Sequence, residues 1–314
     1  MSAYNGVALP FGPDIDEACH AIHDACKGLG TNEAGLIAAL GTKSATQRFL
    51  IARRYPELYH KELKDVLQHE TSSDFGHLLQ LLAQPLPEAE ATILYKATKG
   101  LGTKEKRIYP IVMGRTNVEL GMLKKTYYDM YGKDLGSVMD SDLRGDVKKA
   151  VLASLQAPLH DFDPAIHTPQ RAKDDAEKLF KAGEGRMGTE EHDFINILVT
   201  SPPPHVRAIN AAYVQERKHD LIHAVKHEFS GDAEKALLFL VRMVLEPLVL
   251  LSEVGFGTDE NGLSAALVRY HIVQRDIEPV FKATYGKHLR DRIESEVSGE
   301  YGKLVLAVFD SPVP

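Results

Sequence analysis

The sequence contains no tryptophan and only two cysteines among its 314 residues. It also lacks a long apolar run: the longest, Leu237–Leu245, is interrupted by Arg242, whereas a membrane-spanning helix needs about 20 apolar residues. The segment Met1–Phe11 has neither the basic region nor the apolar stretch of a signal peptide. These absences predict a cytoplasmic protein whose contact with any membrane is peripheral.

Disulfides and an excess of positive charge are absent as well. Cys19 and Cys26 are separated by about 10 Å along one expected helix, too far for a disulfide, and reduced cysteines suit the cytoplasm. Lys and Arg number 37 against 44 Asp and Glu, so the net charge is −7. This balance argues against a nucleic-acid partner, and it would repel an acidic membrane unless a cation lay between them.

What the sequence does contain is a fourfold internal repeat. The pentapeptide Lys-Gly-Leu-Gly-Thr occurs at 27–31 and 99–103, and looser copies occur at 185–189 and 254–258. An acid follows the glycine before each threonine, after 40 residues in three copies and 39 in the fourth: Glu70, Asp142, Glu228 and Glu296. A second acid comes four residues later: Asp74, Asp146, Asp232 and Glu300. Agreement at so many positions predicts four homologous structural units.

Hydrophobic spacing predicts helices throughout the chain. Apolar residues recur every three to four positions from Ile15 to Cys26, as in an amphipathic helix, and Asp14 with Glu17 is placed as a capping box. Each loop threonine is placed as the N-cap of the following helix. Because strand-like alternation is absent, we expect an all-α protein with four repeats of about five helices each.

The repeat spacing also predicts how the chain is divided. A tail (1–12) precedes repeat 1 (13–84), repeat 2 (85–157), a linker (158–170), repeat 3 (171–245) and repeat 4 (246–314). The linker contains three prolines, and we expect it to divide the molecule into halves. Pro247 lies before the fourth loop, which predicts a short first helix in repeat 4.

A glycine loop combined with a remote acid has the chemistry of a calcium site. Glycines allow a sharp turn that leaves carbonyl oxygens accessible, and calcium takes six to eight oxygen ligands. Three carbonyls and one bidentate carboxylate supply about five, which leaves places for water or a phosphate oxygen. Alternatively, each loop only ends one helix and begins the next. The recurrence of loop and acid together favours calcium, although no EF-hand loop is present.

These features together resemble the annexins: the G-x-G-T loop, the acid about 40 residues later, the period of roughly 70 residues and the linker after repeat 2. The resemblance extends from Pro13 to Phe309. It implies repeats arranged as a curved disc with calcium loops on the convex face, and calcium-dependent binding to acidic phospholipid membranes, with self-association there as a further expectation. Calcium then supplies the positive bridge between an acidic chain and an acidic surface.

The resemblance also implies a set of metal ligands in each repeat. Carbonyls of the loop join one carboxylate: Cys26, Gly28 and Gly30 with Glu70; Thr98, Gly100 and Gly102 with Asp142; Gly183, Arg186 and Gly188 with Glu228; Glu253, Gly255 and Gly257 with Glu296. The second acids serve either as accessory ligands or as helix caps. The apolar loop tips either face lipid or pack on a neighbouring loop: Leu29, Leu101, Met187 and Phe256.

Two other classes of function compete with this interpretation. An enzyme is one, because peroxidase or nucleotide-hydrolysing activity has been attributed to some annexins. However, the 14 histidines show no recurring metal or haem spacing, and there is no G-x-x-x-x-G-K-[ST] phosphate loop. The other is a calcium-binding scaffold for protein or polysaccharide partners, for which the tripeptide at 144–146, Arg-Gly-Asp, is the one indication. We expect a non-enzymatic membrane binder.

Overall fold

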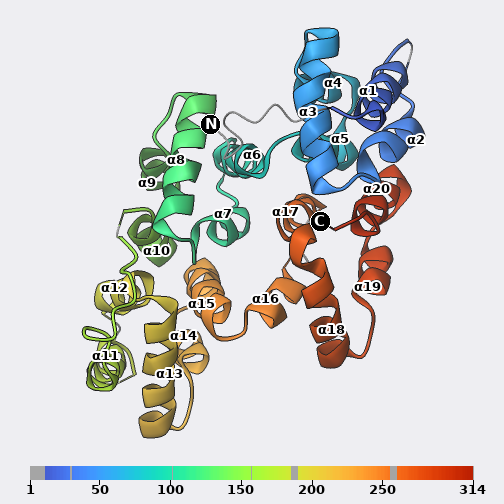
Figure 1. Cartoon of the computed structure of the whole chain (residues 1–314). Helices are drawn as coiled ribbons and strands as arrows, with labels where there is room; N and C mark the ends of the chain where they lie inside the picture. The colour runs from blue at the N-terminus through green and yellow to red at the C-terminus, as the bar shows by residue number, and fades with distance from the viewer. Residues whose placement is uncertain are drawn as a thin grey trace. The chain divides into compact units, whose positions relative to one another are not determined.

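The computed structural model describes residues 11–28, 30–100, 102–156, 158–184, 190–254 and 260–313. Every regular element in these ranges is a helix, from α1 to α20 (Figure 1). Each expected repeat contributes five helices over the described residues, if the short segments η1 and η2 are counted with the α-helices that they adjoin. The all-α, four-repeat architecture is therefore confirmed, while the boundaries between repeats stay a prediction.

The first and fourth repeats have corresponding helices. Those of repeat 1 are α1 (Pro13–Ala25), α2 (Glu33–Leu36) continuing as η1 (Ile37–Gly41), α3 (Ala45–Tyr59), α4 (Leu63–Glu70) and α5 (Ser73–Leu82). Those of repeat 4 are α16 (Pro247–Glu253), α17 (Glu260–Tyr270), η2 (His271–Val273), α18 (Gln274–Tyr285), α19 (Leu289–Glu296) and α20 (Gly299–Phe309). At seven residues, α16 is short, as Pro247 predicted.

The second and third repeats follow the same order. Repeat 2 comprises α6 (Leu86–Thr98), α7 (Glu105–Val112), α8 (Asn117–Tyr131), α9 (Leu135–Asp142) and α10 (Gly145–Gln156). Repeat 3 comprises α11 (Pro169–Ala182), α12 (Glu191–Thr200), α13 (Pro203–Arg217), α14 (Leu221–Glu228) and α15 (Gly231–Leu245).

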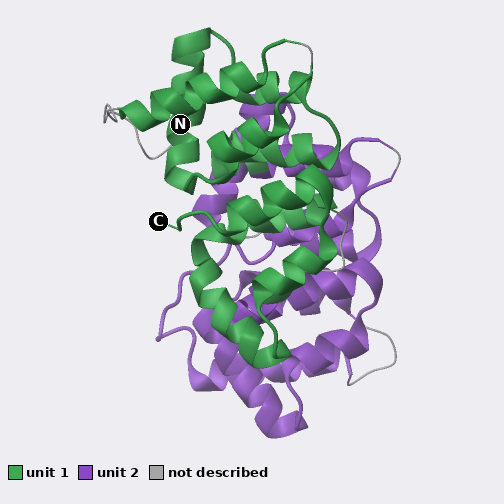
Figure 2. Cartoon of the chain, turned by 90° about the vertical axis from the view of Figure 1, so that its right-hand side faces the viewer, with its two compact units in different colours: residues 1–89, 252–314 green, residues 90–251 purple. Residues whose placement is uncertain are grey.

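The chain forms two compact units, coloured separately in Figure 2, and they do not follow the order of the repeats. The described residues up to Ala89 and from Ser252 onward make one unit, in which α17 packs on α5 and α20 packs on η1. Glu90–Leu251 make the other, in which α10 packs on α12 and α15. The expectation that the proline-containing linker divides the molecule into halves is therefore wrong. It connects two repeats of one unit, because burial of apolar helix faces, not chain order, decides which helices pack together.

The capping box expected from Asp14 and Glu17 is absent from the start of the first helix. Asp14 does not cap α1: the N-cap is Gly12, Pro13 occupies the first turn and no side chain caps the helix. Asp14 instead accepts a hydrogen bond of 3.4 Å from the Gln47 side chain. Complete capping boxes occur at the starts of α3 and α8, where Ser44 and Thr116 are the N-caps.

Candidate functional site

The four predicted acids occupy the same structural position. Glu70, Asp142, Glu228 and Glu296 are each the last residue of a helix of eight residues, namely α4, α9, α14 and α19. Three residues before each acid lies a buried apolar side chain that anchors the helix: Leu67, Met139, Val225 and Ile293. Packing of this side chain in the core thus fixes the position of each short helix, and with it the position of the acid at the end of the helix.

The loops of repeats 1 and 2 have the backbone that their glycines predict. Gly28 and Gly30 have φ of 105° and 86°, and Gly100 and Gly102 have φ of 110° and 79°. A Cβ placed on any of the four would meet no atom within 4 Å, so each glycine borders open space. Glycine is needed here for its backbone conformation and not for lack of room, and all four glycines are exposed.

A main-chain hydrogen bond closes each of these loops at its base. Asn32 N–H donates to the oxygen of Ala25 at 2.9 Å, and Lys104 N–H donates to that of Ala97 at 3.0 Å. Cys26 and Thr98, whose carbonyl oxygens are expected calcium ligands, lie at the ends of α1 and α6, where each loop begins. The two loops are therefore closed by the same main-chain hydrogen bond at corresponding residues.

The loop threonines connect the loops to the acids. Thr31 Oγ1 donates to the main-chain oxygen of Glu70 at 2.6 Å, and Thr103 Oγ1 donates to that of Asp142 at 3.1 Å. The expectation that these threonines are N-caps is wrong, because Asn32 caps α2 and Lys104 is the N-cap residue of α7. Partners 39 residues away take the hydroxyl groups instead, and they bring loop and acid together.

The hydrogen bond from Thr31 brings Glu70 to the first loop, and the charge of Glu70 acts on Cys26 at the start of that loop. Burial raises the pKa of the Cys26 thiol to about 11, and the negative charge of Glu70 contributes to the same rise. The thiol therefore stays protonated at neutral pH, which leaves the main-chain oxygen of Cys26 as its candidate ligand atom. The Glu70 side chain is 31% exposed, with His69 Nδ1 at 3.1 Å, and a hard cation can reach it.

Repeat 3 brings its loop and acid even closer together. A Cβ added to Gly183 would lie 2.7 Å from Cγ of Glu228, so the loop start touches the carboxylate-bearing side chain. Glu190 N–H closes this longer loop by donating to Ala182 at 2.7 Å. The Glu228 side chain is only 8% exposed, and His227 Nδ1 lies 2.8 Å from its Oε1. The other two expected donors, Arg186 and Gly188, lie outside the described residues.

In repeat 4 the side chains of Glu296 and Glu253 are both bound by other side chains. The Arg292 guanidinium forms an ion pair with Glu296 one turn away in α19. Glu253, at the end of α16, accepts a hydrogen bond of 2.6 Å from the Tyr285 hydroxyl. Gly255 and Gly257 lie outside the described residues. A cation at Glu296 would have to compete with the arginine.

The second acids show mostly local contacts. Asp146, Asp232 and Glu300 each pair with a lysine three residues later, at 2.8, 3.1 and 2.6 Å. Asp74 accepts a hydrogen bond of 3.0 Å from Asn261 of the same unit. Stabilisation of the first helical turn accounts for these positions without a metal.

Comparisons with known proteins show the family of the chain. The annexin family model matches four segments of the chain, residues 17–82, 89–154, 174–240 and 251–308. The chain belongs to the annexin family. Human annexin A13 is 35% identical to it over 306 residues, which cover 95% of this chain and 96% of the relative. Human annexin A3 is 35% identical over 306 residues, covering 95% of this chain and 93% of the relative.

Solved annexin structures share the fold. A structure of annexin III is similar to this annexin with a TM-score of 0.83 at 34% identity, over 96% of this chain and 94% of that one. Calcium-bound annexin (Sm)1 has a TM-score of 0.76 at 25% identity, over 95% and 90% of the two chains. Annexins are in general calcium-dependent phospholipid-binding proteins and not enzymes. In the described ranges, none of the helices has the length and apolar character needed to cross a membrane.

One cluster near the third loop was not predicted from the sequence. Glu184, His219 and His223 offer ligand atoms that all lie within 4.8 Å of one another. The spacing of four residues between His219 and His223 is the signal in the sequence, but it does not recur in the other repeats as the loops and acids do.

Proposed function

We propose that this annexin binds acidic phospholipid surfaces through calcium ions held by the loops and acids of repeats 1 and 2. The observation that carries the proposal is the pair of threonine hydrogen bonds, from Thr31 to Glu70 and from Thr103 to Asp142. They join a glycine loop to a carboxylate-bearing helix end in the same way twice. Calcium requires oxygen ligands from separate parts of a chain to be held at one place.

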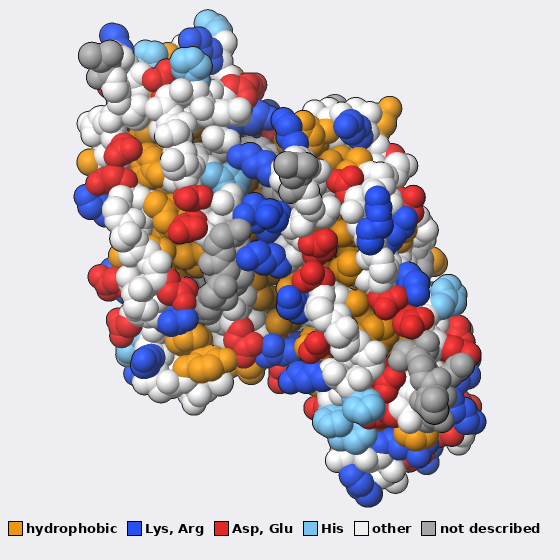
Figure 3. All heavy atoms as spheres, turned by 180° about the vertical axis from the view of Figure 1, so that it is seen from behind, with side chains coloured by type: hydrophobic (Ala, Val, Ile, Leu, Met, Phe, Trp, Pro, Cys, Tyr) orange, Lys and Arg blue, Asp and Glu red, His pale blue; other side chains and the backbone are white. Residues whose placement is uncertain are grey.

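The ligand sets follow from the loop geometry. Main-chain oxygens of Cys26, Gly28 and Gly30 with the carboxylate of Glu70 would hold one ion; those of Thr98, Gly100 and Gly102 with Asp142 would hold a second. Such a set is incomplete for calcium, so a phosphate oxygen of a lipid headgroup can complete it. Bound calcium also offsets the negative charge of the chain. On the face drawn in Figure 3, acidic side chains lie among the basic ones.

We propose weaker sites in repeats 3 and 4. In repeat 3, Gly183, Arg186 and Gly188 would join Glu228, whose carboxylate is mostly covered and held by His227. In repeat 4, Glu253, Gly255 and Gly257 would join Glu296, whose carboxylate must first leave Arg292. The calcium-bound state of annexin (Sm)1 supports calcium as the cofactor. Binding would be peripheral and on the cytoplasmic side, with self-association on the membrane and no catalytic activity.

Co-sedimentation with vesicles tests the proposal. Full-length protein is mixed with vesicles of phosphatidylserine and phosphatidylcholine, or of phosphatidylcholine alone, with calcium or with a chelator. We expect sedimentation only with phosphatidylserine and calcium. The double variant Glu70→Gln/Asp142→Asn should need on the order of tenfold more calcium, because a charged ligand is lost from each site.

The matched control is the double variant Asp65→Asn/Asp140→Asn. Asp65 lies in α4 and Asp140 in α9, so the same charge is removed from the same two helices at residues that are not proposed ligands; Asp140 pairs with Lys148. It should behave as the unmodified protein does. Equal sedimentation with calcium and chelator would overturn the proposal. Calcium binding without any vesicle binding would favour the scaffold alternative.

A further inference from the structure

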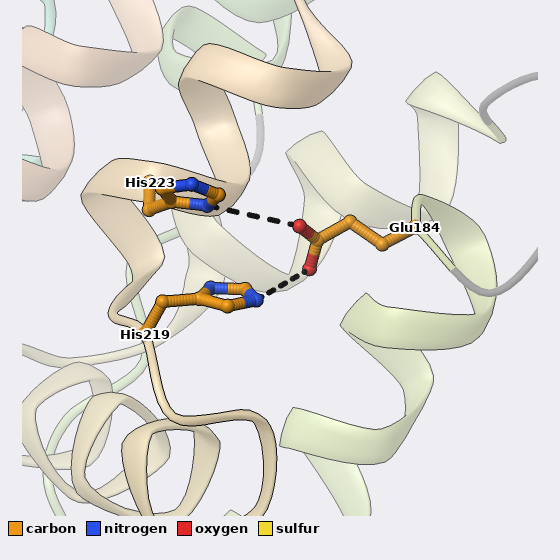
Figure 4. A group of neighbouring side chains, drawn as sticks. All are labelled: Glu184, His219 and His223. Carbon is orange, nitrogen blue, oxygen red and sulfur yellow. Dashed lines mark ion pairs between the residues drawn. The ribbon is translucent and has the colours of Figure 1, made fainter.

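Glu184, His219 and His223 form a compact group in repeat 3. Gly183, next to Glu184 in the chain, lies against the Glu228 side chain. Glu184 follows α11, His219 precedes α14 and His223 lies in the first turn of α14. Figure 4 shows the Glu184 carboxylate pointing toward both imidazole rings. His219 Nε2 is 3.4 Å from Oε2, and His223 Nδ1 is 3.8 Å from Oε1.

We propose that this group binds a divalent transition-metal ion of the zinc class, with water as the remaining ligand. Two imidazole nitrogens and one carboxylate, with one position open, are a donor set that zinc uses. Imidazole favours zinc, copper and nickel, whereas calcium prefers oxygen ligands alone. Zinc bonds of about 2.0–2.2 Å place tetrahedral ligand atoms about 3.3 Å apart. The three ligand atoms lie within 4.8 Å of one another, so side-chain rotations must bring them closer together to reach that spacing.

A second layer of contacts orients the carboxylate. The hydroxyl of Tyr213, which is 1% exposed, donates a hydrogen bond of 2.6 Å to Glu184 Oε2. Partners of this kind fix metal-ligating carboxylates in place. The Glu184 side chain is 12% exposed and that of His223 is 58% exposed, so the group is mostly buried at Glu184 and open to solvent at His223. A metal ion and its water can enter from the open side.

The group is specific to repeat 3. In each repeat the two histidine positions lie two residues before, and two residues after, the leucine that begins the short helix. The other three repeats have no histidine at either position: Lys61 and Asp65, Lys133 and Ser137, Lys287 and Asp291. Glu184 comes from the longer loop of repeat 3. The three metal-ligating side chains therefore occur together in repeat 3 only.

Zinc titration of the full-length, metal-freed protein tests the proposal. A chromophoric chelator competes for Zn²⁺ at neutral pH in the presence of excess calcium, which occupies the oxygen-ligand sites. We expect one zinc equivalent that Glu184→Gln and His223→Ala each weaken by more than about tenfold. Tyr213→Phe, which removes only the hydrogen bond to Glu184, should weaken it by about tenfold. Co²⁺ in place of zinc should show the visible absorption of a tetrahedral ion.

The matched control is His192→Ala, which removes an exposed histidine from α12 of the same repeat and should leave zinc binding unchanged. Far-ultraviolet circular dichroism checks that each variant is folded. Zinc binding that is equal in the unmodified protein, Glu184→Gln and His223→Ala would overturn the proposal. Displacement of the zinc by calcium, or an equal loss in His192→Ala, would also overturn it. None of these outcomes depends on the membrane binding proposed above.

Discussion

The hydroxyl of Thr31 lies 2.6 Å from the main-chain oxygen of Glu70 and donates a hydrogen bond to it. The two residues are 39 positions apart in the chain, yet this bond fixes the end of α4 against the glycine loop. Thr103 and Asp142 repeat the contact in the other unit. We therefore expect calcium affinity and local stability to depend on the same hydrogen bond.

Thr31→Val removes the hydroxyl and keeps the shape of the side chain. We expect the free energy of unfolding to fall by about 1 kcal/mol and the calcium affinity of repeat 1 to fall as well, because loop and acid are no longer joined. Chemical denaturation and calcium titration measure the two effects. In the control Thr42→Val, the lost hydrogen bond is the one to Ala38 within the helix, and calcium affinity should not change. An unchanged affinity in Thr31→Val would show that the bond does not organise the site.

Ser73 occupies a left-handed backbone position where the other repeats have glycine. Its φ is 57°, and the φ of Gly145, Gly231 and Gly299 is 59°, 62° and 63°. A residue with a Cβ costs about 1–2 kcal/mol there, partly offset by the greater freedom of glycine in the unfolded chain. Ser73→Gly should therefore raise the free energy of unfolding by roughly 0.5–1 kcal/mol.

The reverse exchange, Gly145→Ser, should lower stability by a similar amount. A Cβ on Gly145 meets no atom within 4 Å, so only backbone strain is tested. Thermal denaturation of both variants gives the comparison. Destabilisation by Ser73→Gly would mean that contacts of the serine hydroxyl outweigh the strain.

Arg292→Gln releases the carboxylate of Glu296 from its ion pair. An exposed ion pair contributes up to about 1 kcal/mol, so the calcium affinity of repeat 4 should rise by roughly twofold to fivefold. Calcium titration in the Glu70→Gln/Asp142→Asn background isolates the weaker sites. Arg290→Gln is the control, because its partners are Asp310 and Glu294. A decrease in affinity would contradict the assignment of Glu296 as a ligand.

Glu90 and Arg115 form an ion pair in the interior of the unit that contains repeats 2 and 3. Their side chains are 3% and 15% exposed. Glu90→Gln leaves the guanidinium without its counter-charge, and we expect a loss of about 3–5 kcal/mol in the free energy of unfolding. Lys125→Gln, in the exposed pair of Lys125 with Asp129, should cost no more than about 0.5 kcal/mol. Urea denaturation distinguishes the two, and equal losses would refute the argument from burial.

His271 predicts a dependence of stability on pH. Burial, with a further contribution from the charge of Arg48, lowers its pKa from 6.5 to about 4. The unfolded chain therefore binds a proton at His271 between pH 6.5 and 4 that the folded chain does not. Stability from this group is complete above pH 6.5 and is lost as the pH falls toward 4, by about 2–3 kcal/mol.

Denaturation at a series of pH values checks this expectation by comparison with His271→Gln. The variant should have a lower free energy of unfolding at pH 7 and a shallower decline between pH 6.5 and 4, since the titrating group is gone. His192→Gln, which alters an exposed histidine, should keep the original slope. Identical slopes in all three proteins would show that other groups control acid stability.

The sequence by itself determined the repeat, the helices and the position of each acid. Glu70, Asp142, Glu228 and Glu296 were located by spacing alone, and all four end corresponding helices. Spacing has this power because helices form through hydrogen bonds between residues three to four apart and through one buried face. The sharp turns expected of the loop glycines are present in repeats 1 and 2, where all four glycines have positive φ.

Only the tertiary structure decided what each of these groups contacts. Thr31 was expected to cap a helix, but its hydroxyl bonds to Glu70; Glu296 was expected to be an open ligand, but Arg292 pairs with it. The linker lies within one unit, and Glu184 meets two histidines from beyond the next two helices. Packing of apolar faces brings such groups together across tens of residues, and no local spacing encodes those distances.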